Sequence, residues 1–175
     1  MAGLLTFAAS QGAWFAAVVG AAHGLPWIGP VLVGAWVAFA LTRSSAPRRK
    51  ALVLLLAGLF GYLADSALVL GGKLAFPPQS GLGGPDSLWM VSLWVSFALT
   101  LEGAPARLLR RTWLAVLLGG VAGPIAYASG VKLGAAELPA ADSALFVGLV
   151  WAVAMPVLAL LARKGAPPEL GLESA

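Results

Sequence analysis

The chain has 175 residues, of which 60% are hydrophobic and 10% are charged, and its mean hydropathy is +0.91. About a quarter of the residues of an ordinary soluble domain are charged, so this composition excludes a water-soluble globular protein. The chain has no cysteine and one histidine, which excludes disulfides and thiolate or histidine-rich metal sites, and we expect no metal and no cofactor. The net charge of +4 comes from short basic patches between apolar runs, which argues against nucleic acid as a partner.

Six apolar runs follow one another along the chain, and a bilayer-spanning helix needs roughly 20 apolar residues. The polar stretch TRSSAPRRK at 42–50 and the Pro/Gly-rich stretch FPPQSGLGGPDS at 76–87 cannot continue these runs. The sequence predicts an all-α, polytopic membrane protein with a bundle of six transmembrane helices in residues 1–164 and a polar cytoplasmic tail, 165–175. The predicted spans are about 3–22, 27–41, 51–72, 88–101, 112–131 and 141–162.

Lys and Arg residues are distributed unequally between the two ends of these spans. Nine of them follow the second, fourth and sixth runs, whereas only Lys73 and Lys132 follow the first, third and fifth. Because loops rich in Lys and Arg stay in the cytoplasm, both termini are predicted to be cytoplasmic. No Lys or Arg precedes Arg43, so we expect the first run to be retained as a span and not cleaved as a signal peptide.

Asp65 lies inside the third apolar run, where a carboxyl group costs about 2.5 to 3.5 kcal/mol on insertion scales. Helical spacing puts it on the same side as Gly58, Gly61 and Tyr62, a face that neighbouring helices can approach closely. One interpretation is a proton, cation or headgroup site. The other is a structural carboxyl group held by a hydroxyl or backbone group of another helix.

Glycines recur on one face of the fifth run, where Gly119 and Gly123 form a GxxxG motif and Gly120 and Gly130 continue the face. Such a face lets two helix backbones approach each other closely, which predicts helix packing. The alternative is a ligand cleft floored by backbone, with Tyr127 as a polar group in it.

Three basic residues are expected on the outer side of the membrane: His23, Lys73 and Lys132. With Asp65 below them, they could line one outward-open pocket for an anionic headgroup or a carboxylate ligand. Tyr62 and Tyr127 are the candidate hydroxyl groups of this pocket. Glu102 is expected at the cytoplasmic end of the fourth run, as an interfacial carboxylate.

No HExxH, P-loop or GxSxG motif is present, so no catalytic residue can be assigned. The sequence leaves three hypotheses open. The first is a protein that binds or transports a small-molecule or lipid-like ligand. The second is an intramembrane enzyme acting on a lipid or isoprenoid-like substrate, with Asp65 or Glu102 as general acid or base. The third is a scaffold or assembly factor that docks a membrane-protein partner.

Four segments carry a resemblance to a known family: HGLPWIGP at 23–30, GYLADSALVLGGK at 61–73, LWMVSLWVSFALTLE at 88–102 and AGPIAYASGVKLGA at 122–135. Their order resembles the domain of unknown function numbered twenty-eight seventy-eight, a family of small bacterial inner-membrane proteins. The resemblance implies a multi-pass protein of the bacterial inner (cytoplasmic) membrane with no established reaction. It carries over no catalytic residue.

Overall fold

The computed structural model describes residues 2–102 and 111–165, with side chains described for 8–101 and 111–163. The Glu102 side chain, the predicted basic loop around Arg107 and most of the predicted tail therefore lie outside the described residues. The described chain forms six α-helices and one 3-10 turn. They are α1 (Ala2–Ala22), α2 (Ile28–Thr42), α3 (Pro47–Leu70), η1 (Pro78–Ser80), α4 (Leu88–Glu102), α6 (Thr112–Lys132) and α7 (Ser143–Gly165).

The all-α prediction is confirmed, and the helix bounds follow the apolar runs closely. The largest difference is at α3, which begins at Pro47, whereas the run was expected to begin at residue 51. Proline suits the first turn of a helix because its fixed φ is helical and its missing N–H has no partner there. The polar residues 47–50 thus add a turn that hydropathy alone did not indicate.

Three helices are long and apolar enough to cross a membrane: Pro47–Leu70, Thr112–Lys132 and Ser143–Arg163. In the most apolar 18-residue window of these three helices, only 44%, 28% and 33% of the residues, respectively, are buried inside the protein. Large apolar side chains such as Leu55 and Leu70 therefore point outward, where 67% and 79% of their surfaces are exposed. Helices α2 and α4 are apolar but shorter.

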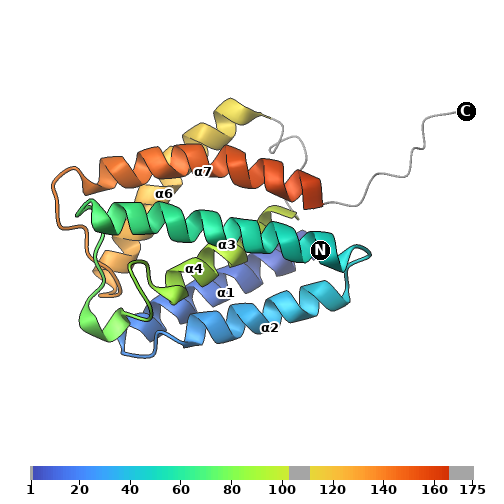
Figure 1. Ribbon diagram of the computed structural model, residues 1–175, viewed down its shortest axis with the longest axis horizontal. Coiled ribbons are helices and arrows are strands. Elements are labelled where there is room, and N and C mark those ends of the chain that lie inside the picture. The colour runs from blue at the N-terminus through green and yellow to red at the C-terminus, as the bar shows by residue number, and fades with distance from the viewer. Residues whose placement is uncertain (1, 103–110, 166–175) are drawn as a thin grey trace, which may run out of the picture.

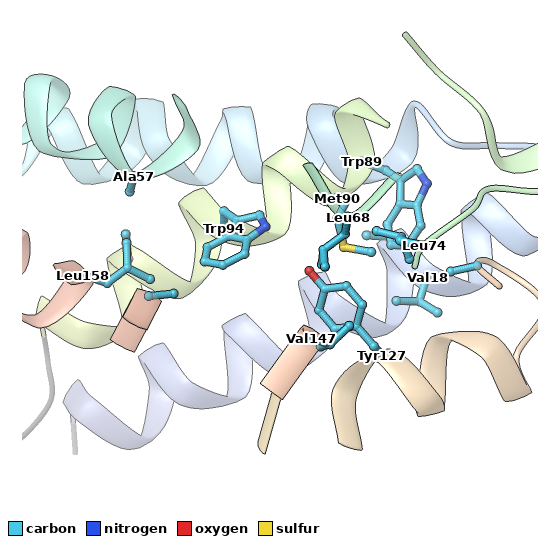
Figure 2. Packing of buried hydrophobic residues seen from close by; sticks show 14 of the residues in the cluster. Val18, Ala57, Leu68, Leu74, Trp89, Met90, Trp94, Tyr127, Val147 and Leu158 are labelled. Carbon is cyan, nitrogen blue, oxygen red and sulfur yellow. The ribbon is translucent and has the colours of Figure 1, made fainter. Parts of the chain in front are cut away.

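The helices are paired into three hairpins, α1–α2, α3–α4 and α6–α7, whose connecting segments all lie at the same end of the bundle (Figure 1). Helix α4 is central, because it packs against α1, α2, α3 and α7. Two of its tryptophans, Trp89 and Trp94, are only 1% exposed and form much of the core (Figure 2). Helix α6 packs on α7 at the side of the bundle.

The first helix of each hairpin ends in the same way. Gly72 and Gly134 have φ of +65° and +82°, a left-handed conformation that favours glycine. The N–H of the following residue then donates to a carbonyl oxygen five residues earlier, from Lys73 to Leu68 at 2.8 Å and from Ala135 to Gly130 at 3.0 Å. Gly24, with φ of +77°, ends α1 similarly.

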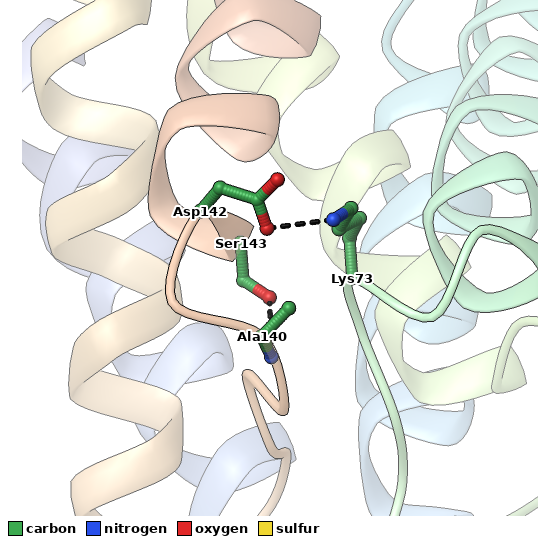
Figure 3. Close-up of polar contacts among 4 residues, drawn as sticks. All are labelled: Lys73, Ala140, Asp142 and Ser143. Atoms are coloured by element: carbon green, nitrogen blue, oxygen red, sulfur yellow. Dashed lines mark hydrogen bonds and ion pairs between the residues drawn. The ribbon is translucent and has the colours of Figure 1, made fainter.

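The connecting segments of the second and third hairpins are bonded to each other. Ala75 and Glu137 exchange two backbone hydrogen bonds of 3.0 and 2.8 Å. Lys73 donates to the carboxylate of Asp142 at 2.6 Å (Figure 3), and this bond lowers the pKa of Asp142. The Ala140 N–H donates to Ser143 Oγ at the start of α7, at 3.1 Å. These contacts hold α3 and α7 together at this end.

The contact between α6 and α7 depends on glycine. A Cβ atom at Gly119 would lie 2.2 Å from the carbonyl oxygen of Trp151, and one at Gly123 would lie 2.4 Å from the Trp151 ring. Real Cβ atoms do not come this close to other atoms, so only glycine permits this helix separation.

We therefore expect Gly119→Ala to destabilise the protein by about 1 to 3 kcal/mol, because the added methyl group overpacks the α6–α7 contact. Gly34→Ala is the matched control, since a Cβ at Gly34 meets nothing within 4 Å. The free energy of unfolding in detergent, followed by SDS titration, measures both. Equal stability of the two variants would contradict the close contact.

Candidate functional site

Asp65 is completely buried in the middle of the bundle and connects three helices. Its Oδ1 accepts a hydrogen bond from the hydroxyl group of Tyr127 on α6, at 2.6 Å. Its Oδ2 accepts one from the indole Nε1 of Trp94 on α4, at 2.7 Å. Both oxygens of the carboxyl group are thus bonded, as burial of a polar group requires.

One of the two donors, Trp94, stacks on a second tryptophan, Trp151 of α7. The rings of Trp94 and Trp151 are 4.4 Å apart and inclined by only 14°. Gly61 and Gly123 lie against this pair, since a Cβ at Gly61 would be 2.1 Å from the Trp94 ring and one at Gly123 would be 2.4 Å from Trp151. Asp65 follows Gly61 by one helical turn and Tyr127 follows Gly123 by one turn. The absence of a side chain at Gly61 and at Gly123 therefore leaves room for the two indole rings next to Asp65 and Tyr127.

A cavity of about 620 Å³ lies next to this cluster. Its walls come from α1 and α4 on one side and from α6 and α7 on the other, and most of the lining is apolar. Trp94, Tyr127 and Trp151 contribute to the wall, whereas Asp65 does not. The carboxyl group thus lies behind the wall and holds two of its aromatic side chains in place.

The cavity is partly open, and large apolar side chains stand among the residues that line it. Phe15 on α1 is 55% exposed, and Ile125 on α6 is 61% exposed. Gly130 also lines the cavity, and a Cβ there would meet nothing within 4 Å. An apolar rim of this kind faces the hydrocarbon of a bilayer more favourably than it faces water.

The structure brings together two of the six predicted ligand-binding residues, Asp65 and Tyr127. Tyr62 points elsewhere, because its hydroxyl group donates to the carbonyl oxygen of Gly84 at 2.8 Å. Among the four predicted packing glycines, Gly119 and Gly123 lie against Trp151, and a Cβ at Gly120 would lie 3.7 Å from the Cβ of Ala152 on α7. Gly130 differs, because it borders the cavity and not a neighbouring helix.

The three basic residues do not converge on Asp65. His23 and Lys132 are exposed at the surface, and His23 Nδ1 lies 2.9 Å from the carbonyl oxygen of Val19 on its own helix. Lys73 pairs with Asp142. The cavity beside Asp65 is therefore mostly apolar, and none of the three basic residues that the sequence placed there lines it.

Sequence reasoning missed Trp94 and Trp151 as site residues, and it missed Asp86. The two tryptophans read as ordinary apolar residues of their helices, and no local pattern showed that the two rings stack. Asp86 read as a polar loop residue in the Pro/Gly-rich segment. It is fully buried, which the composition of that segment did not indicate.

Comparison with family models decides the relationship of the chain. Residues 3–157 match the model described as protein of unknown function (DUF2878). The chain belongs to this family. The DUF2878 match extends from α1 into α7 and includes Asp65, Trp94, Tyr127 and Trp151. The resemblance noted from the sequence is thus confirmed. No curated protein and no solved structure matches the chain.

Loss of one donor to Asp65 has a predictable cost. We expect Tyr127→Phe to lower the free energy of unfolding by about 1 to 3 kcal/mol, because a buried carboxyl oxygen loses its hydrogen bond. Tyr62→Phe, which removes a hydroxyl group whose hydrogen bond to a backbone carbonyl is exposed, is the control and should cost less. SDS-induced unfolding of both variants checks this. A larger effect of Tyr62→Phe would contradict the central role of Asp65.

Proposed function

We propose that this DUF2878 protein is an integral protein of a bacterial inner membrane that binds a lipid-like molecule in the cavity beside Trp94 and Tyr127. The observation that carries this proposal is the cavity itself. Its volume of about 620 Å³ falls within the range of about 300 to 1,000 Å³ that is usual for ligand sites. Its lining is mostly apolar, with a small number of polar groups, which is also usual for such sites.

The proposed topology has six spans and both termini in the cytoplasm. The three hairpin connections lie at one end of the bundle, where Lys73 and the last residue of α6, Lys132, are also found. The opposite end carries the denser group of cations, including Arg43, Arg48 and Arg49. This distribution supports cytoplasmic termini because the cytoplasmic side is enriched in Lys and Arg. The end with the hairpin connections would then face outward.

The chemistry of the lining favours a ligand with an apolar chain and a small polar group. Leu93, Phe97 and Leu118 supply apolar surface, and no charged side chain in the described part of the chain lines the cavity. The indole Nε1 of Trp151 is buried and makes no hydrogen bond of full geometry among the described residues, although it interacts with the Tyr127 hydroxyl group, so these two groups are the polar atoms offered to an oxygen atom of the ligand. A lipid or an isoprenoid-like molecule meets both requirements.

The exposed apolar residues around the cavity support entry from the bilayer. Phe15 and Ile125 belong to α1 and α6, which stand on opposite sides of the cavity. A molecule that enters between these helices remains in an apolar environment throughout. Binding and transport share this first step.

The enzyme hypothesis gains no specific support. Asp65 lies behind the cavity wall with both oxygens bonded to side chains of the protein, so it does not face a substrate in the cavity. The side chain of Glu102 lies outside the described residues. The third hypothesis, a scaffold that docks a membrane-protein partner, is not assigned to a particular surface of the described residues.

The cavity is tested by filling it. We expect Gly130→Leu to occupy the cavity and reduce ligand binding, because a side chain at this position extends into open space. Gly34→Leu is the matched control, since Gly34 is exposed and also has nothing within 4 Å of its Cβ position. A photoactivatable fatty acid in the membrane is the probe.

The readout is labelling of Tyr127, which is 5% exposed and thus shielded from bulk lipid. The proposal predicts labelling in the wild type and in Gly34→Leu, and a loss of at least several-fold in Gly130→Leu. The proposal would be contradicted if Tyr127 were not labelled in the wild type. Equal labelling of Tyr127 in all three proteins would contradict it as well.

A further inference from the structure

Asp86 is a second buried carboxyl group, separate from the side chains that bond Asp65. It lies in the segment between η1 and α4, two residues after Gly84. The carbonyl oxygen of Gly84 accepts a hydrogen bond from the hydroxyl group of Tyr62. This bond places the segment against α3. The Asp86 side chain has 0% exposure, and neither carboxyl oxygen has a hydrogen-bond partner among the described residues.

The charge environment of Asp86 is unfavourable for an ionised carboxylate. Burial and, after it, the negative charge of Asp65 raise the pKa of Asp86 from 3.8 to about 8, and the backbone N–H of the adjacent Ser87 opposes this shift more weakly. Tyr127 is the other titratable group whose charge interacts with that of Asp86. The hydroxyl group of Tyr62 contacts the same segment, because it donates to the carbonyl oxygen of Gly84. No Lys, Arg or His contributes to this shift among the described residues. Lys73, on the same connecting segment, is paired with Asp142.

A metal ion does not fit this site as well as a proton does. Calcium takes six to eight oxygen ligands, and magnesium requires a nearly octahedral set. The described residues contain no group of three or more His, Asp or Glu residues that could hold a metal. Ser66 Oγ on α3, one turn after Tyr62, is also buried and has no hydrogen-bond partner among the described residues. A proton neutralises a carboxylate without any coordination shell.

We propose that Asp86 is a proton-binding site, at which one buried carboxyl group takes up and releases a proton beside the hydrogen-bonded carboxyl group of Asp65. Release of the proton leaves a negative charge that no side chain of the described residues pairs with and that repels the charge of Asp65. Uptake removes that charge. The inference stands on the buried, unpartnered oxygens of Asp86 and does not depend on the presence of a ligand in the cavity.

Infrared spectroscopy of the full-length protein tests this, because a protonated carboxyl group has its own C=O stretching band. We expect a carboxylic acid band in the wild type at pH 6 that is lost as the pH rises through about 8. Asp86→Asn should lack the part of this band that is lost near pH 8. Asp142→Asn is the control and should keep it, because Asp142 is ion-paired with Lys73 and has a lowered pKa.

The pH dependence of the melting temperature of the wild type gives a second readout that does not require the variant to fold. A carboxyl group whose pKa is higher in the folded than in the unfolded state stabilises the fold fully below the unfolded value. Its contribution falls from about pH 4 and is lost as the pH rises through about 8. We expect the melting temperature of the wild type to fall across this interval, and that of Asp142→Asn to fall likewise.

Two results would overturn the inference. One is the absence of a protonated carboxyl band at pH 6 in folded wild-type protein. The other is a band that depends on the concentration of sodium or potassium at constant pH, which would identify a metal cation as the species bound at Asp86.

Discussion

A carboxyl group in an apolar bundle must be hydrogen-bonded, and the rest of this structure is arranged around that requirement at Asp65. Its two donors come from Trp94 on α4 and Tyr127 on α6, so one side chain fixes the relative positions of three helices. The donors reach it because Gly61 and Gly123 leave room for the stacked indole rings. A side chain at Gly61 would displace the Trp94 ring and leave Oδ2 of the carboxyl group without its donor, at a cost of about 1 to 3 kcal/mol.

The same arrangement gives the cavity its shape. Trp94 and Tyr127 form part of its wall, and the bonds to Asp65 hold both side chains from behind. Helices α6 and α7 are packed closely through glycines, whereas the cavity occupies the space between this pair and α1 with α4. The buried carboxyl group thus has a structural role toward the cavity, and the proton-binding role proposed for Asp86 is distinct from it.

The helices of this fold could be predicted because apolar runs, prolines and basic loops are local signals. Burial of Asp65 on the glycine face of α3 was also predictable, since a carboxyl group in a span must turn inward. The pairing of Asp65 with Trp94 and Tyr127 was not, because those residues are 29 and 62 positions away in the chain. The cationic pocket was inferred from residues at the same end of the bundle, yet Lys73 finds its counter-ion in Asp142 and His23 stays at the surface.

Native mass spectrometry of the protein, purified gently from its own membranes, tests the central claim most directly. If the cavity binds a membrane-derived molecule, the spectrum of the folded monomer will contain a bound species of defined mass, and extraction will identify it as a lipid or isoprenoid-like compound. A folded protein that carries no molecule of defined mass, but only a random set of bulk phospholipids, would contradict the claim that the cavity is a binding site.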